Sequence, residues 1–368
     1  MKRKQFIKKS ILGVAASSFV IGSCEPKQKE LISAPNIITN KKYKWKLVTT
    51  WPPNFPVLGE GCVNMANIIR EMSGGRMDIN VYGGGELIPA LESFDAVSSG
   101  AVEMGHGAAY YWAGKNPALQ FFTTVPFGLN AMHMSCWIFN WGGLKLWEEM
   151  YGKYNLIPFP AGNTGVQMAG WFNKEINSIE DFKGLKMRIP GFGGGVLQKA
   201  GGTPVLSAGS EIYTNLERGV IDATEWIGPY HDYIMGFHKI AKYYYAPGWH
   251  EPGPILDLFV NKRAFEDLPI DLQSIIRAAA TSMHNWCIGE FESKNNEYLA
   301  KIKSESNVEV RVLNQDVLEN LKKYTDEALQ ELIDKSQDSK KVYEAFIKFK
   351  NEIKIWASYS EKLYHNLM

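Results

Sequence analysis

Hydrophobic and polar positions follow two different periods along the chain, and these periods predict its helices and strands. Apolar residues at every second position are typical of strands, whereas apolar residues three and four positions apart are typical of helices. The patterns predict strands at residues 45–49, 77–81 and 102–105, and helices at residues 58–72 and 89–99 that end before glycines. Such alternation favours parallel α/β lobes.

The C-terminal part of the chain has a different pattern. It is largely helical, at residues 272–303, 317–333 and 342–367, with a short strand at residues 308–312. A chain of 368 residues is long for one domain, so we expect two lobes. The predicted units are a first lobe of residues 43–164 with part of 255–304, a second lobe of residues 165–254, and a helical region of residues 271–368 that braces the lobes or offers a homodimer surface.

The first 23 residues have the pattern of an export signal peptide. A basic start precedes an apolar stretch at residues 11–22, which is too short to span a bilayer as a helix. The sequence IGSC then resembles a bacterial lipobox, in which Cys24 would be lipidated, and residues 24–42 read as a polar tether. The alternative is a plain export peptide with a chance cysteine. Lys4 replaces the second arginine of a twin-arginine signal, so both the Tat and the Sec routes stay open.

Charge argues against nucleic acid as a partner. Removal of residues 1–23 removes five positive charges and no negative ones, which changes the formal net charge from +1 to −4. The remaining chain has no basic stretch of the kind that binds nucleic acid, and no later apolar run long enough for a transmembrane helix. We expect an extracytoplasmic protein, anchored to a membrane only through Cys24.

The cysteines and histidines show no metal-binding spacing. Cys62, Cys136 and Cys287 lie far apart, which predicts three buried thiols or at most one disulfide. His250 and Glu251 are adjacent, and on a strand they would point to opposite faces. We therefore do not expect zinc.

Polar residues at the ends of short apolar runs form the candidate site. Arg188 lies in a strand-like run that is closed by Pro190 and Gly191, and Glu225 follows the run 220–224. The planar guanidinium of arginine matches a carboxylate bidentately and stays charged at any working pH. With Gln167, Trp226 and Glu251, these residues predict a polar site for a small charged molecule.

Two other interpretations of the same residues are open. Arg188 could form a structural ion pair with Glu225 or Asp222. Glu225 and Glu251 could act as a hydrolase acid and base, although the nearby Arg188 would lower a carboxyl pKa rather than raise it. No nucleophile motif is present, so no catalytic residue is assigned and no enzyme is expected.

Two glycine clusters follow apolar runs, at residues 83–85 and 193–195. Neither fits a phosphate-binding loop or a dinucleotide-binding fingerprint. We expect them to allow turns and close backbone approach. The second cluster could also present the amides of a helix N-terminus to an anion.

Three motifs carry a family resemblance. They are WKLVTTWP at residues 45–52, GLKMRIPG at residues 184–191 and GVIDATEW at residues 219–226. From residue 45 to about residue 300 the chain resembles the DctP-type solute receptors of TRAP transporters, and most of all the receptors for 2-oxo acids that bind substrate with a metal cation. The resemblance implies a two-lobed α/β fold like that of periplasmic binding proteins, and a partner, a sodium-driven TRAP permease.

The resemblance also implies roles for individual residues. Arg188 would hold the substrate carboxylate, and Gln167 would contact both substrate and cation. Glu225, Glu251 and the backbone carbonyl of Trp226 would complete the cation site. Aromatic residues of the first lobe would close over the substrate, and the candidates are Tyr110, Tyr111 and Trp51.

Charge makes a cation plausible independently of the resemblance. One guanidinium, two carboxylates and a bound monocarboxylate sum to −2 in a cleft that excludes water, which is unfavourable. One Na⁺ or one Ca²⁺ would relieve this charge, and oxygen ligands suit both ions. We therefore expect a receptor that closes on a 2-oxo or 2-hydroxy monocarboxylate together with a cation. The alternatives are a receptor of the same fold for another organic acid or a sugar, and a lipid-anchored hydrolase.

Overall fold

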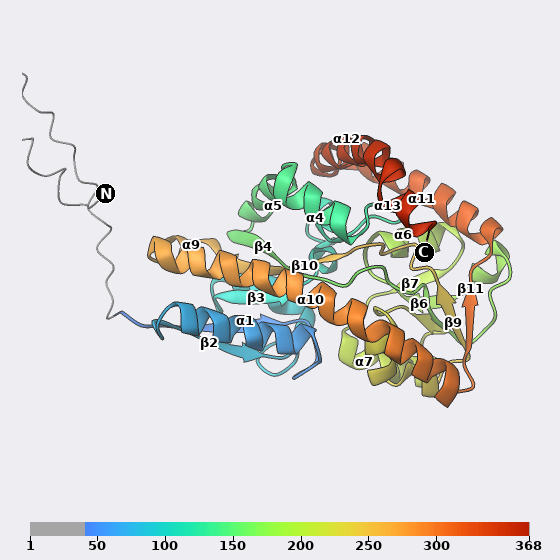
Figure 1. Cartoon of the computed structure of the whole chain (residues 1–368), viewed down its shortest axis with the longest axis horizontal. Helices are drawn as coiled ribbons and strands as arrows, with labels where there is room; N and C mark the ends of the chain where they lie inside the picture. Colours follow the sequence, from blue (N-terminus) through green and yellow to red (C-terminus); the bar gives the residue numbers. More distant parts are fainter. Residues whose placement is uncertain (1–40, 368) are drawn as a thin grey trace, which may run out of the picture. The chain divides into compact units, whose positions relative to one another are not determined.

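Two mixed β-sheets form the framework of the protein in the computed structural model, which describes residues 41–367 (Figure 1). The first sheet has the strand order β2-β1-β3-β10-β4. Its strands are β1 (Tyr43–Thr49), β2 (Met77–Tyr82), β3 (Met104–Gly107), β4 (Leu156–Asn163) and β10 (Ile255–Asn261). β1 runs parallel to both of its neighbours, whereas β10 runs antiparallel to β3 and β4. The chain therefore returns to the first sheet through β10 after five strands of the second sheet, and it crosses back to the second sheet with β11.

The second sheet has the strand order β11-β9-β5-β8-β6-β7. Its strands are β5 (Gly170–Phe172), β6 (Lys186–Arg188), β7 (Thr203–Val205), β8 (Ala223–Thr224), β9 (Tyr243–Ala246) and β11 (Glu309–Val312). β6 is parallel to β7 and β8, and β5 is antiparallel to β8 and β9. These strands are short. Arg188 is the last residue of β6, and Gln167, Glu225 and Glu251 lie in the loops outside the strands.

Helices connect the strands of each sheet. Those between β1 and β4 are α1 (Leu58–Met72), η1 (Ala90–Glu92), α2 (Ser93–Ser99), η2 (Ala109–Trp112), η3 (Pro117–Leu119), α3 (Gln120–Thr123), α4 (Ala131–Asn140) and α5 (Gly143–Gly152). Those between β5 and β10 are η4 (Ile179–Phe182), α6 (Gly191–Lys199), α7 (Gly209–Glu217), α8 (Pro229–Ile234) and η5 (Phe237–Lys239). α2 ends at Gly100, which adopts the left-handed conformation (φ 81°) that terminates many helices.

One long helix, α10 (Ile270–Glu305), follows the short α9 (Lys262–Glu266) and joins the two sheets. Its first half buries Leu272, Ile276 and Met283 in the core under the first sheet. Its second half buries Phe291 and Ile302 in a core that also holds residues of the second sheet. With 36 residues it is about 54 Å long, and it lies across both halves (Figure 1).

Three further helices end the described chain: α11 (Gln315–Lys335), α12 (Gln337–Tyr359) and α13 (Glu361–His365). α11 packs against α6 beside the second sheet, whereas α12 packs against α5 and η3 beside the first. The C-terminal helices therefore bridge the two halves a second time (Figure 1).

The predicted fold class is confirmed, and α1 has the predicted bounds. Several details differ from the prediction, and one is that the helix expected at residues 342–367 begins five residues earlier, at Gln337, and is divided at Ser360. β3 begins two residues later than expected, the helix expected at residues 89–99 begins as the 3-10 helix η1, and residues 193–195 lie inside α6 rather than in a turn. The close approach expected there is real, because a Cβ on Gly193 would lie 2.7 Å from the Ile189 side chain.

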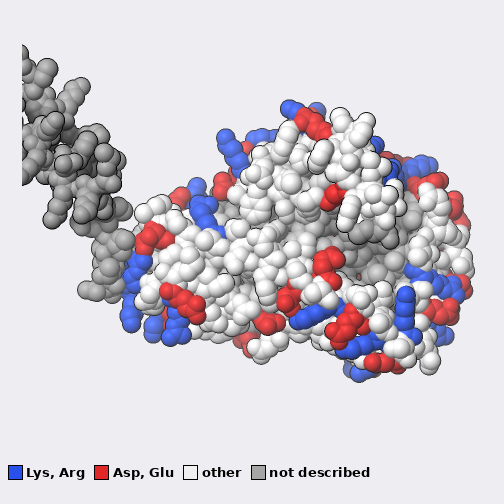
Figure 2. Space-filling view, in the orientation of Figure 1, with Lys and Arg blue, Asp and Glu red and all other residues white. Residues whose placement is uncertain are grey.

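The three cysteines between residues 41 and 367 are free, and Cys136 is only partly buried, so the expectation of three buried thiols is wrong for that residue. Acidic and basic side chains are interspersed over the face drawn in Figure 2, without a large area of one sign. Within the described part of the chain, no helix is long and apolar enough to cross a membrane. The predicted signal peptide, Cys24 and nearly all of the tether lie outside the described residues.

Candidate functional site

The register of the second sheet brings Arg188 and Glu225 together. Arg188, the last residue of β6, is paired with Thr224 on the parallel strand β8. Glu225 is the next residue, so it leaves the sheet at the same edge, and its amide donates to the Arg188 carbonyl at 3.2 Å. The guanidinium and the Glu225 carboxylate form an ion pair, and both side chains are almost completely buried (1% and 0% exposed). The ion pair considered as an alternative from the sequence is therefore present.

Other groups surround the Arg188 guanidinium. Its Nε donates to the Ser207 carbonyl at 3.4 Å, and its Nη2 donates to the Tyr111 hydroxyl at 3.4 Å. The ring of Trp226 lies 5.4 Å from the guanidinium carbon. Burial opposes the charged form, but Glu225 and the two tyrosines more than offset this, so the pKa of Arg188 lies above its usual value. Arg188 therefore carries a fixed positive charge at this point.

Gln167 and Glu251 are held side by side by backbone hydrogen bonds. The Gln167 amide donates to the Glu251 carbonyl at 3.2 Å, and the Gly248 amide donates to the Gln167 carbonyl at 2.8 Å. Both side chains are buried. Burial first, and then the charge of Glu225, raise the pKa of Glu251 well above its usual value. Two carboxyl groups thus share one site with a single guanidinium.

The structure adds His250, which sequence reasoning did not place in the site. One ligand atom from each of Glu225, His250 and Glu251 lies within 4.8 Å of the others, and all three residues are buried. The expectation that His250 and Glu251 point to opposite faces is wrong, because they lie in a turn after β9 and not in a strand. A hydrogen bond from the Glu251 amide to the Gly248 carbonyl (3.1 Å) closes this turn. Adjacency to Glu251 was the only signal for His250 in the sequence.

Several oxygen atoms in the site have no hydrogen-bond partner within residues 41–367. They are Oε1 of Gln167, Oε2 of Glu225 and Oε2 of Glu251. Nε2 of His250 lies 3.4 Å from Oε2 of Glu225 without hydrogen-bond geometry. Buried polar atoms are normally satisfied, so this concentration of unpaired acceptors in one place indicates a ligand site. Acceptor oxygens of this kind suit a hard cation such as Na⁺ or Ca²⁺.

Two tyrosines approach the site from the side of the first sheet. Tyr110 and Tyr111 lie in η2, directly after β3, and their rings pack edge to face with centroids 4.8 Å apart. Gly191 permits the approach of Tyr110, because a Cβ there would lie 3.1 Å from the Tyr110 Cβ. The hydrogen bond between Tyr111 and Arg188 therefore links the two halves directly.

Trp51 reaches the same place from the loop after β1. Its ring packs edge to face on Trp226, with centroids 6.3 Å apart, and lies 6.4 Å from the Tyr111 ring. Its indole Nε1 donates to Nδ1 of His106 at 2.7 Å, and Nε2 of His106 donates to the Ala161 carbonyl at 3.0 Å. Burial lowers the pKa of His106 to about 4, so the imidazole is neutral and accepts this hydrogen bond. His106 is a second residue that the sequence gave no reason to select.

The segment that carries Glu225 and Trp226 is anchored by a buried carboxyl group. Asp232 accepts hydrogen bonds from the Ile227 amide (3.2 Å), the Trp171 indole (2.9 Å) and the Tyr244 hydroxyl (2.7 Å). Burial raises the pKa of Asp232 to about 7 despite these donors. The structure thus brings the predicted substrate and cation residues into one cluster, which is buried except for the partly buried Tyr111, whereas Cys24 lies outside the described residues.

Comparison with known proteins identifies the family of the chain. Residues 47–336 match the family described as bacterial extracellular solute-binding protein, family 7 (DctP). The chain is 38% identical over its whole length to the monocarboxylate 2-oxoacid-binding periplasmic protein of Nostoc sp., of which it covers 98%.

Two similar crystal structures are TRAP periplasmic solute-binding proteins. One, from Pseudoalteromonas atlantica, contains sodium and pyruvate; it is 43% identical with a TM-score of 0.86, and the match covers 89% of this chain and 100% of that one. The other, from Colwellia psychrerythraea, contains calcium and pyruvate; it is 44% identical with a TM-score of 0.85 and the same coverage. The resemblance inferred from the three motifs is confirmed: the chain belongs to the DctP family of extracellular solute-binding proteins, the solute receptors of TRAP transporters.

Proposed function

We propose that this receptor binds a small 2-oxo or 2-hydroxy monocarboxylate together with a cation and delivers it to a sodium-driven TRAP permease. The main support is the buried cluster itself, in which Arg188, Glu225, Glu251 and Gln167 meet and three oxygens have no partner among the described residues. The relatives that bind pyruvate with sodium or calcium support the same ligand class. As a member of a receptor family, the protein returns its ligand unchanged, and we propose that it catalyses nothing.

Each site residue has a proposed role. Arg188 holds the substrate carboxylate, because its guanidinium is buried, permanently charged and fixed by Glu225 and Tyr111. The substrate carboxylate would thereby bind a guanidinium that is already oriented by hydrogen bonds to Ser207, Glu225 and Tyr111. Gln167 contacts both substrate and cation, with its amide nitrogen already donating to Thr164 at 3.1 Å and its oxygen free to coordinate.

The cation is proposed to bind between the two carboxylates. Glu225, Glu251, the oxygen of Gln167 and the carbonyl of Trp226 would hold it, and the bound ion would supply positive charge that offsets the substrate and both carboxylates. His250 lies within reach of the same atoms. We propose that it orients the Glu225 carboxylate, since nitrogen ligands are less suited to Na⁺ and Ca²⁺ than oxygen ligands are.

The aromatic residues are proposed to close the site. Trp51, Tyr110 and Tyr111 come from the half that contains the first sheet, whereas Arg188 and Glu225 come from the half that contains the second. A substrate between them would contact both halves, so closure by a hinge motion would bury it. The proposed lobes are residues 43–164 with part of 255–304, and residues 165–254, braced by the helical region 271–368.

We also propose a membrane anchor and a homodimer. The family is extracytoplasmic, and lipidation of Cys24 would tether the protein by residues 24–42.

For the homodimer, the support is a set of exposed apolar side chains on α12 and α13: Ile355, Trp356, Tyr359, Leu363 and Tyr364. Light scattering after size exclusion would test it. Trp356→Glu should convert a dimer to a monomer, and a monomeric wild-type protein would contradict the proposal.

The experiment that tests the binding function is calorimetric titration of pyruvate and of its longer 2-oxo analogues, with and without sodium or calcium. Binding of at least one 2-oxo monocarboxylate is expected, and the nuclear magnetic resonance spectrum of the recovered ligand should be unchanged. Binding of sugars or dicarboxylates in preference to every 2-oxo monocarboxylate would contradict the proposal.

A further inference from the structure

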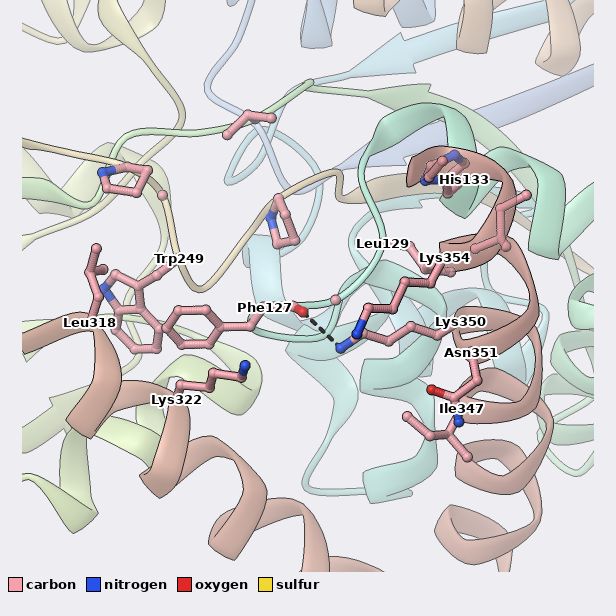
Figure 3. A pocket seen from close by; sticks show the side chains of 17 residues that line it. Phe127, Leu129, His133, Trp249, Leu318, Lys322, Ile347, Lys350, Asn351 and Lys354 are labelled. Atoms are coloured by element: carbon pink, nitrogen blue, oxygen red, sulfur yellow. Dashed lines mark hydrogen bonds between the residues drawn. The ribbon is translucent and has the colours of Figure 1, made fainter. Parts of the chain in front are cut away.

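A cavity of about 680 Å³ lies beside the C-terminal helices, separate from the buried cluster (Figure 3). Its walls come from the loop 127–129, the turn 247–252 and the helices α11 and α12. Neither Arg188, Gln167, Glu225 nor Glu251 lines it. Cavities of this size are typical of small-molecule sites.

Three lysines point into this cavity from the two helices. Lys322 belongs to α11, and Lys350 and Lys354 are one turn apart on α12 (Figure 3). Lys350 is partly buried and donates to the Phe127 carbonyl at 2.8 Å. No carboxylate of residues 41–367 lies within 4.0 Å of any of the three ammonium groups.

The three charges act on one another. Burial lowers the pKa of Lys350; Asp326 opposes this, and the charges of Lys322 and Lys354 add to the lowering. Two carboxylates bear on the cavity: that of Asp326, whose charge acts on Lys350, and that of Glu361, which lies 3.5 Å from His133. A bound anion between the lysines would relieve this repulsion.

The rest of the wall is apolar. The rings of Phe127 and Trp249 are stacked with centroids 5.9 Å apart, and Leu318 lies next to Trp249 (Figure 3). Ile347 and Ile353 belong to the opposite wall, on α12. The cavity therefore combines a cluster of cations with an apolar body, which fits a molecule that has one anionic end and a hydrocarbon or aromatic remainder.

From this arrangement we infer that the cavity is a second ligand site, which binds a small amphipathic organic anion with its carboxylate on Lys322, Lys350 and Lys354 and its apolar part on Phe127, Trp249 and Leu318. This site goes beyond the proposed transport function, because its residues differ from those of the substrate site. Its occupant is longer and more apolar than a 2-oxo acid of pyruvate size.

The two sites share one turn of backbone. Trp249 and Pro252 line the cavity, whereas His250 and Glu251 belong to the buried cluster. The Phe127 amide donates to the Trp249 carbonyl at 2.8 Å, and the Phe127 carbonyl accepts from Lys350. An anion on Lys350 would act through these hydrogen bonds on the turn that carries Glu251, and any change in affinity at one site would be matched by the same factor at the other.

Octanoate is a suitable probe, with octanol as the uncharged control of equal chain length. Titration into the full protein, free of 2-oxo acids, is expected to show saturable binding of octanoate and none of octanol. Lys350→Met should weaken octanoate binding about tenfold or more, because a charge-assisted contact is lost. Lys348→Met is the matched control, since Lys348 is exposed on the same helix outside the cavity.

Lys354→Met is a second variant, and it keeps the hydrogen bond between Lys350 and the Phe127 carbonyl. The inference can therefore still be tested if Lys350→Met does not fold. Both variants are first compared with wild type by circular dichroism. The inference is wrong if octanoate fails to bind at millimolar concentration, if both lysine variants bind it as well as wild type, or if Arg188→Lys abolishes its binding. It is also wrong if octanoate binds only when a dimer dissociates, since a second copy would then fill the cavity.

Discussion

Arg188, the last residue of β6, and Glu225, the residue after the parallel strand β8, form a fully buried ion pair. Removal of one partner from such a pair leaves a buried charge without compensation, which destabilises a protein far more than loss of an exposed pair. The pair therefore fixes the guanidinium in one orientation. Nε donates to Ser207, Nη1 to Glu225 and Nη2 to Tyr111, so one further N–H on Nη1 and one on Nη2 are available to an incoming carboxylate.

We predict that Arg188→Lys weakens binding of 2-oxo acids by about 2 kcal/mol or more, because an ammonium cannot form the bidentate contact. Positive charge is retained next to Glu225, so the protein should still fold. Isothermal calorimetry measures the affinity, and Arg218→Lys serves as a control because Arg218 is exposed on the same half. Unchanged affinity in Arg188→Lys would leave the guanidinium with a structural role only.

Cation and acid are predicted to bind cooperatively. Each relieves charge repulsion that the other meets beside Glu225 and Glu251, so the ion must raise acid affinity by the same factor as the acid raises ion affinity. Titration of pyruvate into metal-stripped protein, before and after restoration of Na⁺ or Ca²⁺, measures this factor. Glu225→Gln should weaken both ligands. Equal pyruvate affinity with and without every ion would exclude a shared site.

His106 is predicted to act on ligand binding through Trp51. His106→Phe keeps an aromatic ring but leaves the buried indole N–H of Trp51 without an acceptor, at a cost of about 1 to 3 kcal/mol. The affinity for 2-oxo acid should fall, and much less so when Trp51→Phe is already present. A double-mutant cycle tests this coupling. Additive losses in the two single variants would show that His106 serves the core of the first sheet alone.

A buried carboxyl group in the first half should make stability depend on pH. Burial raises the pKa of Asp257 to about 7, although the Tyr151 hydroxyl donates to it at 2.6 Å. A pKa that is higher in the folded than in the unfolded state means that the folded form holds the proton longer. Asp257 therefore destabilises the fold progressively as pH rises from about 4 to about 7.

Asp257→Asn should remove this dependence, because the amide is neutral and still accepts from Tyr151. Relative to wild type, the variant should gain about 2 kcal/mol of stability between pH 5 and pH 8. Urea unfolding at pH 5 and pH 8 measures the free energy of unfolding of both proteins. The contributions of the other titrating groups cancel in the difference between variant and wild type. A constant difference between variant and wild type would mean that Asp257 is ionised in the folded protein.

Lipidation of Cys24 is tested by fractionation. Wild-type protein should stay with membranes, and Cys24→Ala should appear in the soluble periplasmic fraction, because the acyl chains on Cys24 would supply the proposed anchor. Mass spectrometry of the mature terminus checks the modification. A mature wild-type protein that is soluble and begins at another residue would exclude the anchor.

Local patterns predicted much of the fold because local physics controls those parts. α1 has a strong helical period and ends before Gly74 and Gly75, which both have positive φ values, so its bounds were predictable. The place of β10 between β3 and β4 was not predictable, because strand pairing over a long sequence separation leaves no trace in periodicity. The 3-10 geometry of η1 was not predictable either, because the 3-10 helix and the α-helix differ little in their sequence periods.

Some residues of the candidate site could likewise be predicted from the sequence, and others could not. Arg188 and Glu225 stand out because charged residues between apolar ones need a reason to be there. His250 does not, because its position depends on a turn whose shape is set by hydrogen bonds to Gln167 and Phe127. His106 looks like any histidine in a buried strand until its contact with Trp51 is known.

The helix α10 has a mechanical consequence for the receptor. Its two halves belong to the cores of the two different sheets, and the hydrogen-bonded rise of about 1.5 Å per residue fixes its length. The helix therefore restricts translation of the two halves relative to each other, whereas rotation of the halves about it is less restricted. With the proposed hinge closure, ligand binding would change the outline of the molecule in one defined way, and a membrane partner could then distinguish a loaded receptor from an empty one by shape.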